Sequence, residues 1–146
     1  LQKAAVPIKI VPGVTAATAA AARLGAPLVT DFAVISLSDL LTPWNLIEKR
    51  LNAAAEADFV IVFYNPQSTG RKEPLINAHQ ILLRHRSPDT PIGIVRHVGR
   101  KGEETTITTL KMLLDCAVDM ATTIIVGNST TRVVGGRMVT PRGYDL

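Results

Sequence analysis

The chain has 146 residues, of which 47% are hydrophobic and 19% are charged. This length predicts a single domain, and this composition excludes a disordered chain because it supplies enough apolar side chains for a core. Sixteen basic residues against twelve acidic ones give a net charge of +4, but the basic residues are scattered and aromatic residues make up only 4%. No nucleic-acid partner is therefore expected, since such surfaces combine a dense basic stripe with stacking aromatics.

The same composition argues against a membrane segment and a metal site. No apolar run approaches the roughly 20 residues of a membrane-spanning helix, and the first residues lack the order of a secretion signal. A single cysteine, Cys116, leaves no intrachain disulfide and no cysteine cluster for zinc. We expect a cytoplasmic protein without a metal site, whose modest positive charge suits a small anionic substrate.

Strands and helices alternate in the first half of the chain. The strand-like stretch IKIV (8–11) leads into Pro12-Gly13, and an alanine-rich helix is expected over 15–24. Residues 32–38 predict the next strand, and Thr42 is expected to cap a helix over 43–57 that begins with a proline.

The middle of the chain repeats this order. The stretch FVIVFY (59–64) is apolar on both faces, which is typical of a central strand in a covered sheet. A helix over 73–86 follows, with Leu75, Ile76, Leu82 and Leu83 expected to face inward.

The last third is rich in strands. Residues 92–98 and 122–127 predict strands, and residues 132–140 predict a hairpin about Gly135-Gly136. Alternating strands and helices followed by a strand-rich tail indicate an α/β layered domain with a mixed β-sheet flanked by helices. No shift in composition marks a second domain within residues 1–146.

The start of the first helix is a candidate binding site. Thr15 and Ala16 stand where a strand passes into a helix, and unpaired backbone N–H groups there suit a polar ligand. A turn, a helix cap and tight packing explain the same residues structurally, and the sequence favours that alternative.

Polar or glycine residues also follow two later strands. Asn65 follows Tyr64, and Arg71 and Lys72 come soon after them. The next strand ends in Arg96, His97, Gly99, Arg100 and Lys101. Such strand ends predict the rim of a cleft, and arginine suits carboxylates. A structural asparagine turn and a solvated loop are the alternatives. Of the three histidines, only His97 is placed to meet a ligand.

Four stretches together resemble a known family. They read VPGVTAATAAAARLGAPLVTDFAVISLSDLLTPW, YNPQSTGR, PIGIVRHVGRKGEETTITTL and TTIIVGNSTTRVVGGRMVTPRGY. They are similar to the tetrapyrrole methylases, and SLSDLLTPW, YNP and VGNS…TPRGY point within them to the precorrin-3B C(17)-methyltransferases of cobalamin biosynthesis. The resemblance implies two α/β domains with S-adenosylmethionine in the cleft between them. Residues 1–146 match the C-terminal domain, and the N-terminal domain is expected to be absent from this chain.

The resemblance also implies an activity and a set of site residues. The activity is S-adenosylmethionine-dependent methylation of precorrin-3B, an anionic tetrapyrrole, at C-17 with contraction of the ring. The positions that match cofactor contacts are Thr15, Ala16, Tyr64, Asn65, Gly99 and Thr122. The residues expected to meet substrate carboxylates are Arg71, Lys72, Arg96, His97, Arg100 and Lys101. No residue is identified for catalysis.

Three alternatives follow for the function. The chain is part of this C-17 methyltransferase, part of a methyltransferase for another precorrin, or a domain that serves only dimerisation or ligand docking. The resemblance favours the first, and it implies a homodimer for the full-length enzyme. The 146 residues alone are expected to be inactive and to bind the cofactor weakly, because half of the cleft would be missing.

Overall fold

The computed structural model describes residues 7–29, 31–68 and 70–143. Its main sheet has five strands in the order β2-β3-β6-β4-β5, with bounds β2 (Phe32–Ser36), β3 (Val60–Tyr64), β6 (Thr122–Val126), β4 (Pro91–Arg96) and β5 (Glu104–Thr109). Strand β2 runs parallel to β3, whereas β6 runs antiparallel to both β3 and β4. The mixed sheet predicted from the sequence is therefore confirmed.

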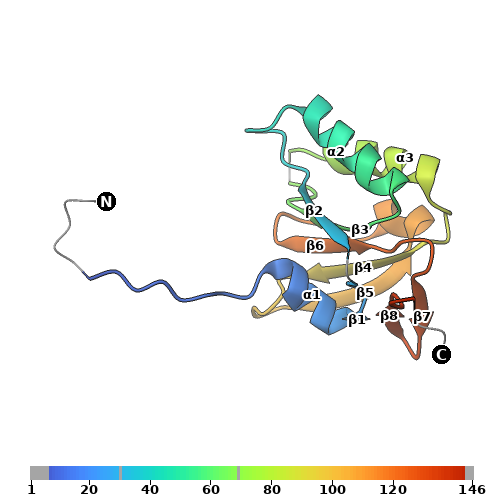
Figure 1. Cartoon of the computed structure of the whole chain (residues 1–146). Coiled ribbons are helices and arrows are strands. Elements are labelled where there is room, and N and C mark those ends of the chain that lie inside the picture. Colours follow the sequence, from blue (N-terminus) through green and yellow to red (C-terminus); the bar gives the residue numbers. More distant parts are fainter. Residues whose placement is uncertain (1–6, 30, 69, 144–146) are drawn as a thin grey trace.

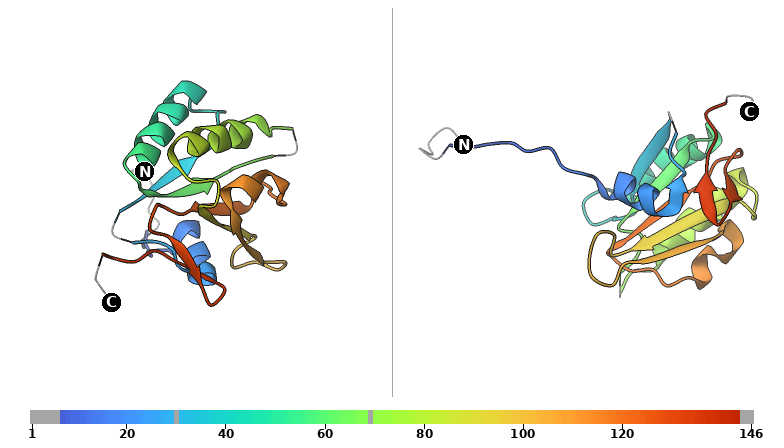
Figure 2. Two further views of the ribbon diagram at one scale, coloured as in Figure 1. Left: turned by 90° about the vertical axis from the view of Figure 1, so that its right-hand side faces the viewer. Right: turned by 90° about the horizontal axis from the view of Figure 1, so that it is seen from below.

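Helices cover both faces of this sheet. One face carries α2 (Trp44–Glu56), α3 (Glu73–His85) and the short 3-10 helix η1 (Leu110–Asp115), and the other carries α1 (Ala16–Leu24). Figure 2 shows α2 and α3 side by side above the sheet and α1 below it. The α/β layered architecture is thus confirmed.

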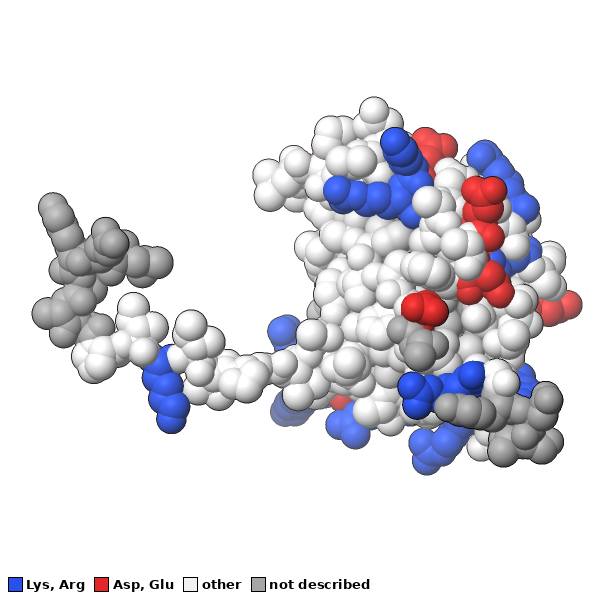
Figure 3. All heavy atoms as spheres, in the orientation of Figure 1, with Lys and Arg blue, Asp and Glu red and all other residues white. Residues whose placement is uncertain are grey.

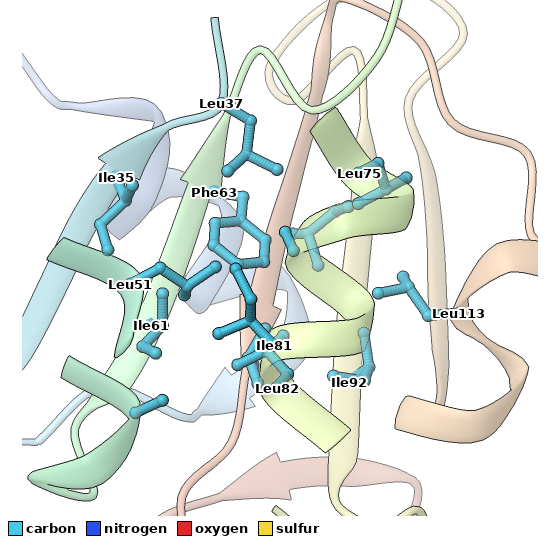
Figure 4. Packing of buried hydrophobic residues seen from close by; sticks show 14 of the residues in the cluster. Ile35, Leu37, Leu51, Ile61, Phe63, Leu75, Ile81, Leu82, Ile92 and Leu113 are labelled. Atoms are coloured by element: carbon cyan, nitrogen blue, oxygen red, sulfur yellow. The ribbon is translucent and has the colours of Figure 1, made fainter. Parts of the chain in front are cut away.

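Strand β3 supplies the core on both faces. Its side chains alternate, so that Ile61 and Phe63 join the cluster under α2 and α3 while Val60 and Val62 join the cluster under α1. Phe63 lies fully buried in the middle of the first cluster (Figure 4). Burial of each such side chain contributes roughly 1.5–3 kcal/mol. The central position predicted for this strand is confirmed.

The alanines of α1 let this helix lie close to the sheet. Ala17, Ala20 and Leu24 are buried against β4 and β6. Strand β4 beneath the helix has a glycine at the contact, Gly93, and a Cβ added there would collide with the Leu24 side chain. On this face of the helix the alanine run is a packing feature.

A second, smaller sheet closes the domain beside α1. It has the order β1-β8-β7, with bounds β1 (Gly25–Ala26), β8 (Arg137–Val139) and β7 (Arg132–Val134). The turn between β7 and β8 holds Gly135 and Gly136 at φ 57° and 74°, as a two-residue hairpin turn requires. The predicted hairpin is confirmed.

Three local predictions are wrong. Residues 8–11 form no strand but an exposed extended segment without a sheet partner in the described chain, and a strand needs a neighbour to bond its backbone. Helix α2 begins after Pro43 without a side-chain cap, so Thr42 does not cap it. Leu83 is exposed, and Ala78 and Ile81 are buried in its place.

Charge is distributed unevenly over the surface. On the face drawn in Figure 3, acidic side chains lie mainly at the centre and right of the domain, basic ones lie at its top and along its lower edge, and the left-hand part is mostly uncharged. Among the described residues, no helix has both the length and the apolar character needed to cross a membrane.

Candidate functional site at the carboxyl edge of the sheet

Three strands end at one edge of the main sheet, which we call the carboxyl edge. Strands β2, β3 and β4 run in the same direction, because β3 and β4 are both antiparallel to β6. The register pairs Ser36 with Tyr64 and Arg96 with Thr122 at this edge. The polar strand ends noted in the sequence are therefore brought together. Ligands of α/β sheets commonly bind in this position.

Helix α1 begins at the carboxyl edge and is tied to it. The Ala17 backbone N–H donates to the hydroxyl of Tyr64 over 2.8 Å, and the Thr18 N–H donates to the Thr15 hydroxyl over 3.4 Å. The structural role that the sequence offered for Thr15, a helix cap, is confirmed. Tyr64 serves as a second cap, which the sequence did not predict because the two residues are 47 positions apart.

Two hollows open at this edge. The first has a volume of about 270 Å³ and is lined by Val14, Ala16, Ala19, His97, Val98, Arg100, Ala121 and Thr123. The second has a volume of about 500 Å³ and is lined by Gln67, Ser68, Lys72, His97, Val118, Asp119, Met120 and Ala121. They share His97 and Ala121, so His97 forms part of the wall between them.

Asp119 organises the charges around His97. Its carboxylate lies 3.2 Å from His97 Nε2 and 3.0 Å from Arg96 Nη2, and it accepts a hydrogen bond from the Thr122 hydroxyl over 2.8 Å. Burial favours a higher pKa for Asp119, but the hydrogen bonds from Thr122, Arg96 and the Ala121 backbone outweigh it and lower the pKa. Asp119 is therefore ionised at neutral pH and fixes the imidazole of His97.

Arg96 is held between two carboxylates. Besides Asp119, its guanidinium pairs with Glu104 over 2.7 Å. The hydrogen bond that Arg96 donates to Asp119 and the charge of Glu104 raise the pKa of Arg96 further above its usual value. Its charge is thus already matched within the chain.

Comparison with known proteins identifies the family of the chain. The sequence profile described as Tetrapyrrole (Corrin/Porphyrin) Methylases matches residues 1–114. The chain belongs to this family. The resemblance read from the four sequence stretches is confirmed.

Individual relatives of this tetrapyrrole methylase chain agree with that assignment. The chain is 55% identical over 145 residues to the probable cobalt-factor III C(17)-methyltransferase of Salmonella typhimurium, and the match covers 99% of this chain and 60% of that protein. A protein of the same name from Methanocaldococcus jannaschii is 50% identical over 146 residues, covering 95% of this chain and 59% of that protein. The crystal structure of the methyltransferase CobJ is similar with a TM-score of 0.83 and 40% identity, covering 96% of this chain and 59% of that one. The chain therefore spans about 60% of the length of these relatives.

The cofactor positions expected in the tetrapyrrole methylase chain differ in how they meet the first hollow. Ala16 lines it directly, and Gly99, at φ 69°, lies between the lining residues Val98 and Arg100. Asn65, at φ 49°, donates from its side-chain amide to the Ser36 hydroxyl over 3.1 Å. Thr122 is buried and bonded to Asp119, and its neighbours Ala121 and Thr123 line the hollow instead.

The substrate positions expected in this chain also separate into two groups. Lys72 and His97 line the second hollow, Arg100 lines the first, and Lys101 is exposed on the same loop outside both linings. Arg71 pairs with Asp39 over 2.7 Å, as Arg96 pairs with its two carboxylates. Because acidic side chains already neutralise these two arginines, each attracts a ligand carboxylate less strongly than an unpaired arginine would.

The described side chains can bind and orient a ligand, but they do not form a metal cluster. No group of three or more histidine, cysteine or acidic side chains in the described ranges is arranged to hold a metal ion. His79 and His85 lie away from this edge, and each ring Nε2 is bonded, to the Leu110 carbonyl and to Asn52 respectively.

The sequence missed one buried charge elsewhere in the fold. Arg86 donates to the carbonyl oxygens of Ala55 over 2.6 Å and Phe59 over 3.0 Å, and it pairs with Asp58 over 3.0 Å. Burial lowers the pKa of Arg86, and the charge of Asp58 opposes that effect. In the sequence Arg86 ends a basic helix terminus, and nothing there signals burial.

Proposed function

We propose that this chain supplies the cofactor-binding edge of an S-adenosylmethionine-dependent methyltransferase that acts at C-17 of a tetrapyrrole in cobalamin biosynthesis. One observation carries the proposal. The first hollow, between the start of α1 and the loop after β4, belongs to a chain 55% identical to a protein named for C(17) methylation of cobalt-factor III. Contraction of the ring, which the resemblance implies, belongs to the same proposed reaction.

The first hollow fits the adenosine part of S-adenosylmethionine. Ala16 and Ala19 have short side chains, so a flat ring can approach the helix backbone closely. Val98 offers an apolar contact on the opposite wall, and Thr123 offers a hydroxyl group. A hollow of about 270 Å³ is of the order expected for part of such a ligand.

Binding, orientation and exclusion of water are the tasks of the residues at this edge. When bound, S-adenosylmethionine supplies a methyl group on a sulfonium, which is already activated for transfer. The chain therefore has no need of a side-chain nucleophile, and alignment of donor and acceptor carbon is the main contribution. Thr15 and Tyr64 contribute by fixing the start of α1, which forms one wall of the hollow.

Substrate carboxylates are proposed to meet the basic residues that lie free of ion pairs at this edge. Lys72 in the second hollow and Arg100 in the first form none of the ion pairs recorded within the described chain. His97, fixed by Asp119, stands between the two hollows and reaches both. Arg71 and Arg96 take a secondary part in this proposal, because acidic side chains already neutralise them.

The relatives' names favour a cobalt-containing substrate. Four relatives that are 48% to 55% identical to this chain are named for cobalt-factor III, and a fifth, at 50%, is named cobalamin biosynthesis protein CbiHC. The Mycobacterium CobIJ proteins are 42% identical. We propose cobalt-factor III as the substrate, with cobalt as part of the substrate, and precorrin-3B as the alternative. A homodimer and a cytoplasmic location stay predictions.

Methyl transfer tests the proposal directly. The protein encoded by the whole gene is incubated with S-adenosylmethionine and either cobalt-factor III or precorrin-3B, and products are identified by mass spectrometry and NMR. We expect S-adenosylhomocysteine and a product methylated at C-17 in a contracted ring. Methylation at another carbon would assign the chain to a sister enzyme, and binding without turnover would support a docking domain.

A further inference from the structure

The loop that forms one wall of the first hollow has an unusual backbone. It connects β4 to β5 and holds three residues at positive φ, namely His97 at 52°, Gly99 at 69° and Gly102 at 81°. Two hydrogen bonds close it on itself, from Arg100 N to the His97 oxygen over 2.8 Å and from Glu103 N to the Arg100 oxygen over 3.2 Å. A non-glycine residue at positive φ costs energy and persists only where its surroundings hold it.

Glu103 holds this loop through one contact within the loop and one contact with α1. One carboxylate oxygen accepts the Gly99 backbone N–H over 2.6 Å, and the other lies 2.7 Å from Arg23 Nε in the last turn of α1. We call these two contacts the Glu103 bridge. A hydrogen bond to an ionised acceptor is about twice as strong as a neutral one, whereas the exposed ion pair alone contributes little. The contact with Gly99 is therefore the stronger arm.

The Glu103 bridge joins the two walls of the first hollow. Ala16, Ala19 and Arg23 are spaced three and four residues apart, so they lie on one face of α1. The first two line the hollow, and the third reaches Glu103. The loop supplies Val98 and Arg100 to the opposite wall, on either side of the bonded Gly99. One carboxylate therefore contacts both the helix and the loop that wall the first hollow.

The neighbouring acid binds on the other side of the hairpin. Glu104 pairs with Arg96, which in turn pairs with Asp119 beside the second hollow. Two consecutive carboxylates thus bind different parts of the fold. Glu103 contacts the helix and the loop that wall the first hollow without lining the hollow itself.

We propose that Glu103 is a positioning residue for the cofactor. It holds the Gly99 amide and the loop against α1 so that the first hollow is formed before the ligand arrives. The inference rests on the proposed function, because it assumes that the first hollow receives the adenosine of S-adenosylmethionine. Glu103 itself touches no reacting atom.

The test uses the protein encoded by the whole gene and titrates S-adenosylhomocysteine by calorimetry. Glu103→Ala removes both arms and is expected to raise the dissociation constant about tenfold, the size of one hydrogen bond to a charged group. Glu103→Gln keeps an acceptor for Gly99 without the charge and is expected to recover most of the loss. Arg23→Met removes only the ion pair and is expected to change the constant less than about threefold.

Two further readouts separate positioning from general stability. We expect the Michaelis constant for the tetrapyrrole to rise less than the dissociation constant for S-adenosylhomocysteine in Glu103→Ala, because Lys72 lies outside the loop, and we expect the amide proton of Gly99 to move upfield when the carboxylate is lost. Glu56→Ala, on the exposed surface of α2, is the matched control and should change nothing. Equal affinity in wild type and Glu103→Ala, or an equal loss for cofactor and tetrapyrrole, overturns the inference alone. Absence of binding by the wild type overturns the proposed function and this inference with it.

Discussion

The two ends of the main sheet use charged residues in different ways. At the amino end of β3, Arg86 is almost completely buried, and two backbone carbonyls and Asp58 take up its guanidinium. At the carboxyl edge, Arg96 and His97 are partly exposed, and their common partner Asp119 borders an open hollow. Asp58 and His97 both adopt positive φ, so backbone strain alone does not distinguish the two ends. At the structural end the charge of Arg86 is buried and two of its three guanidinium nitrogens are bonded, whereas at the open carboxyl edge the charged side chains are partly exposed. A hollow of about 290 Å³ also borders Asp58 and Arg86, so burial of the charge, rather than the presence of a hollow, separates the two ends.

The largest expected effect tests the structural end. Arg86→Met should lower the free energy of unfolding by roughly 3 kcal/mol, because it leaves two carbonyls and Asp58 without their charged donor. Urea denaturation measures this change. The affinity for S-adenosylhomocysteine under native conditions should not change.

Arg84→Met is the matched control, since Arg84 is exposed in the same turn of α3. It should cost less than about 0.5 kcal/mol. A loss of cofactor affinity in folded Arg86→Met would contradict the separation of the two ends.

An intermediate effect concerns Asp119, which belongs to the open edge but also stabilises it. Its folded pKa is lowered, so its contribution is present above the ordinary aspartate pKa near 4 and is lost as pH falls through the folded pKa. Asp119→Asn should therefore destabilise the protein at pH 7 by about 1 kcal/mol or less, since the carboxylate is about a third exposed.

The difference between wild type and Asp119→Asn should shrink as pH falls below about 4, where the wild-type carboxylate becomes protonated. Unfolding free energies at a series of pH values measure it, with the exposed Asp115→Asn as control. A difference independent of pH would show that the charge of Asp119 is irrelevant to stability.

The smallest expected effect lies at the open edge. Lys72→Met should raise the Michaelis constant for the tetrapyrrole about threefold, as expected of an exposed charge contact, and leave the melting temperature nearly unchanged. The wild-type constant should rise with salt and that of the variant should rise less. Lys49→Met on the exposed surface of α2 is the control. Identical Michaelis constants and salt slopes in wild type and Lys72→Met would show that Lys72 faces solvent and does not contact the substrate.

Local patterns predicted most of the fold. The apolar stretch at 59–64, the helix over 73–86 and the hairpin at Gly135-Gly136 depend on neighbouring residues, and the structure confirms them. The segment at 8–11 has the composition of a strand, but pairing depends on a neighbour that no local pattern reveals. Local patterns therefore predict helices and strands more reliably than they predict which strands pair.

The sequence predicted where the candidate site lies better than it predicted which side chains there are free to bind a ligand. Strand ends identified the edge, because parallel strands bring their carboxyl ends together. The pairing of Arg71 with Asp39 and of Arg96 with Asp119 depends on contacts 32 and 23 residues apart, and Tyr64 reaches α1 across 47 residues. Charge counts cannot tell a free arginine from a paired one, so the paired arginines were expected to bind substrate as readily as Lys72.

The small sheet beside α1 has a consequence for the order in which the protein is made. Gly25 pairs with Met138, and the Thr140 hydroxyl donates to the Pro27 carbonyl across 113 residues. Met138 is fully buried in the cluster that also holds Ala17 and Leu24. During synthesis α1 therefore leaves the ribosome early but must wait for β8 before its packing surface is complete. The first hollow, which α1 walls, also needs the loop after β4 and Thr123 of β6, so it too is completed only after most of the domain has been made.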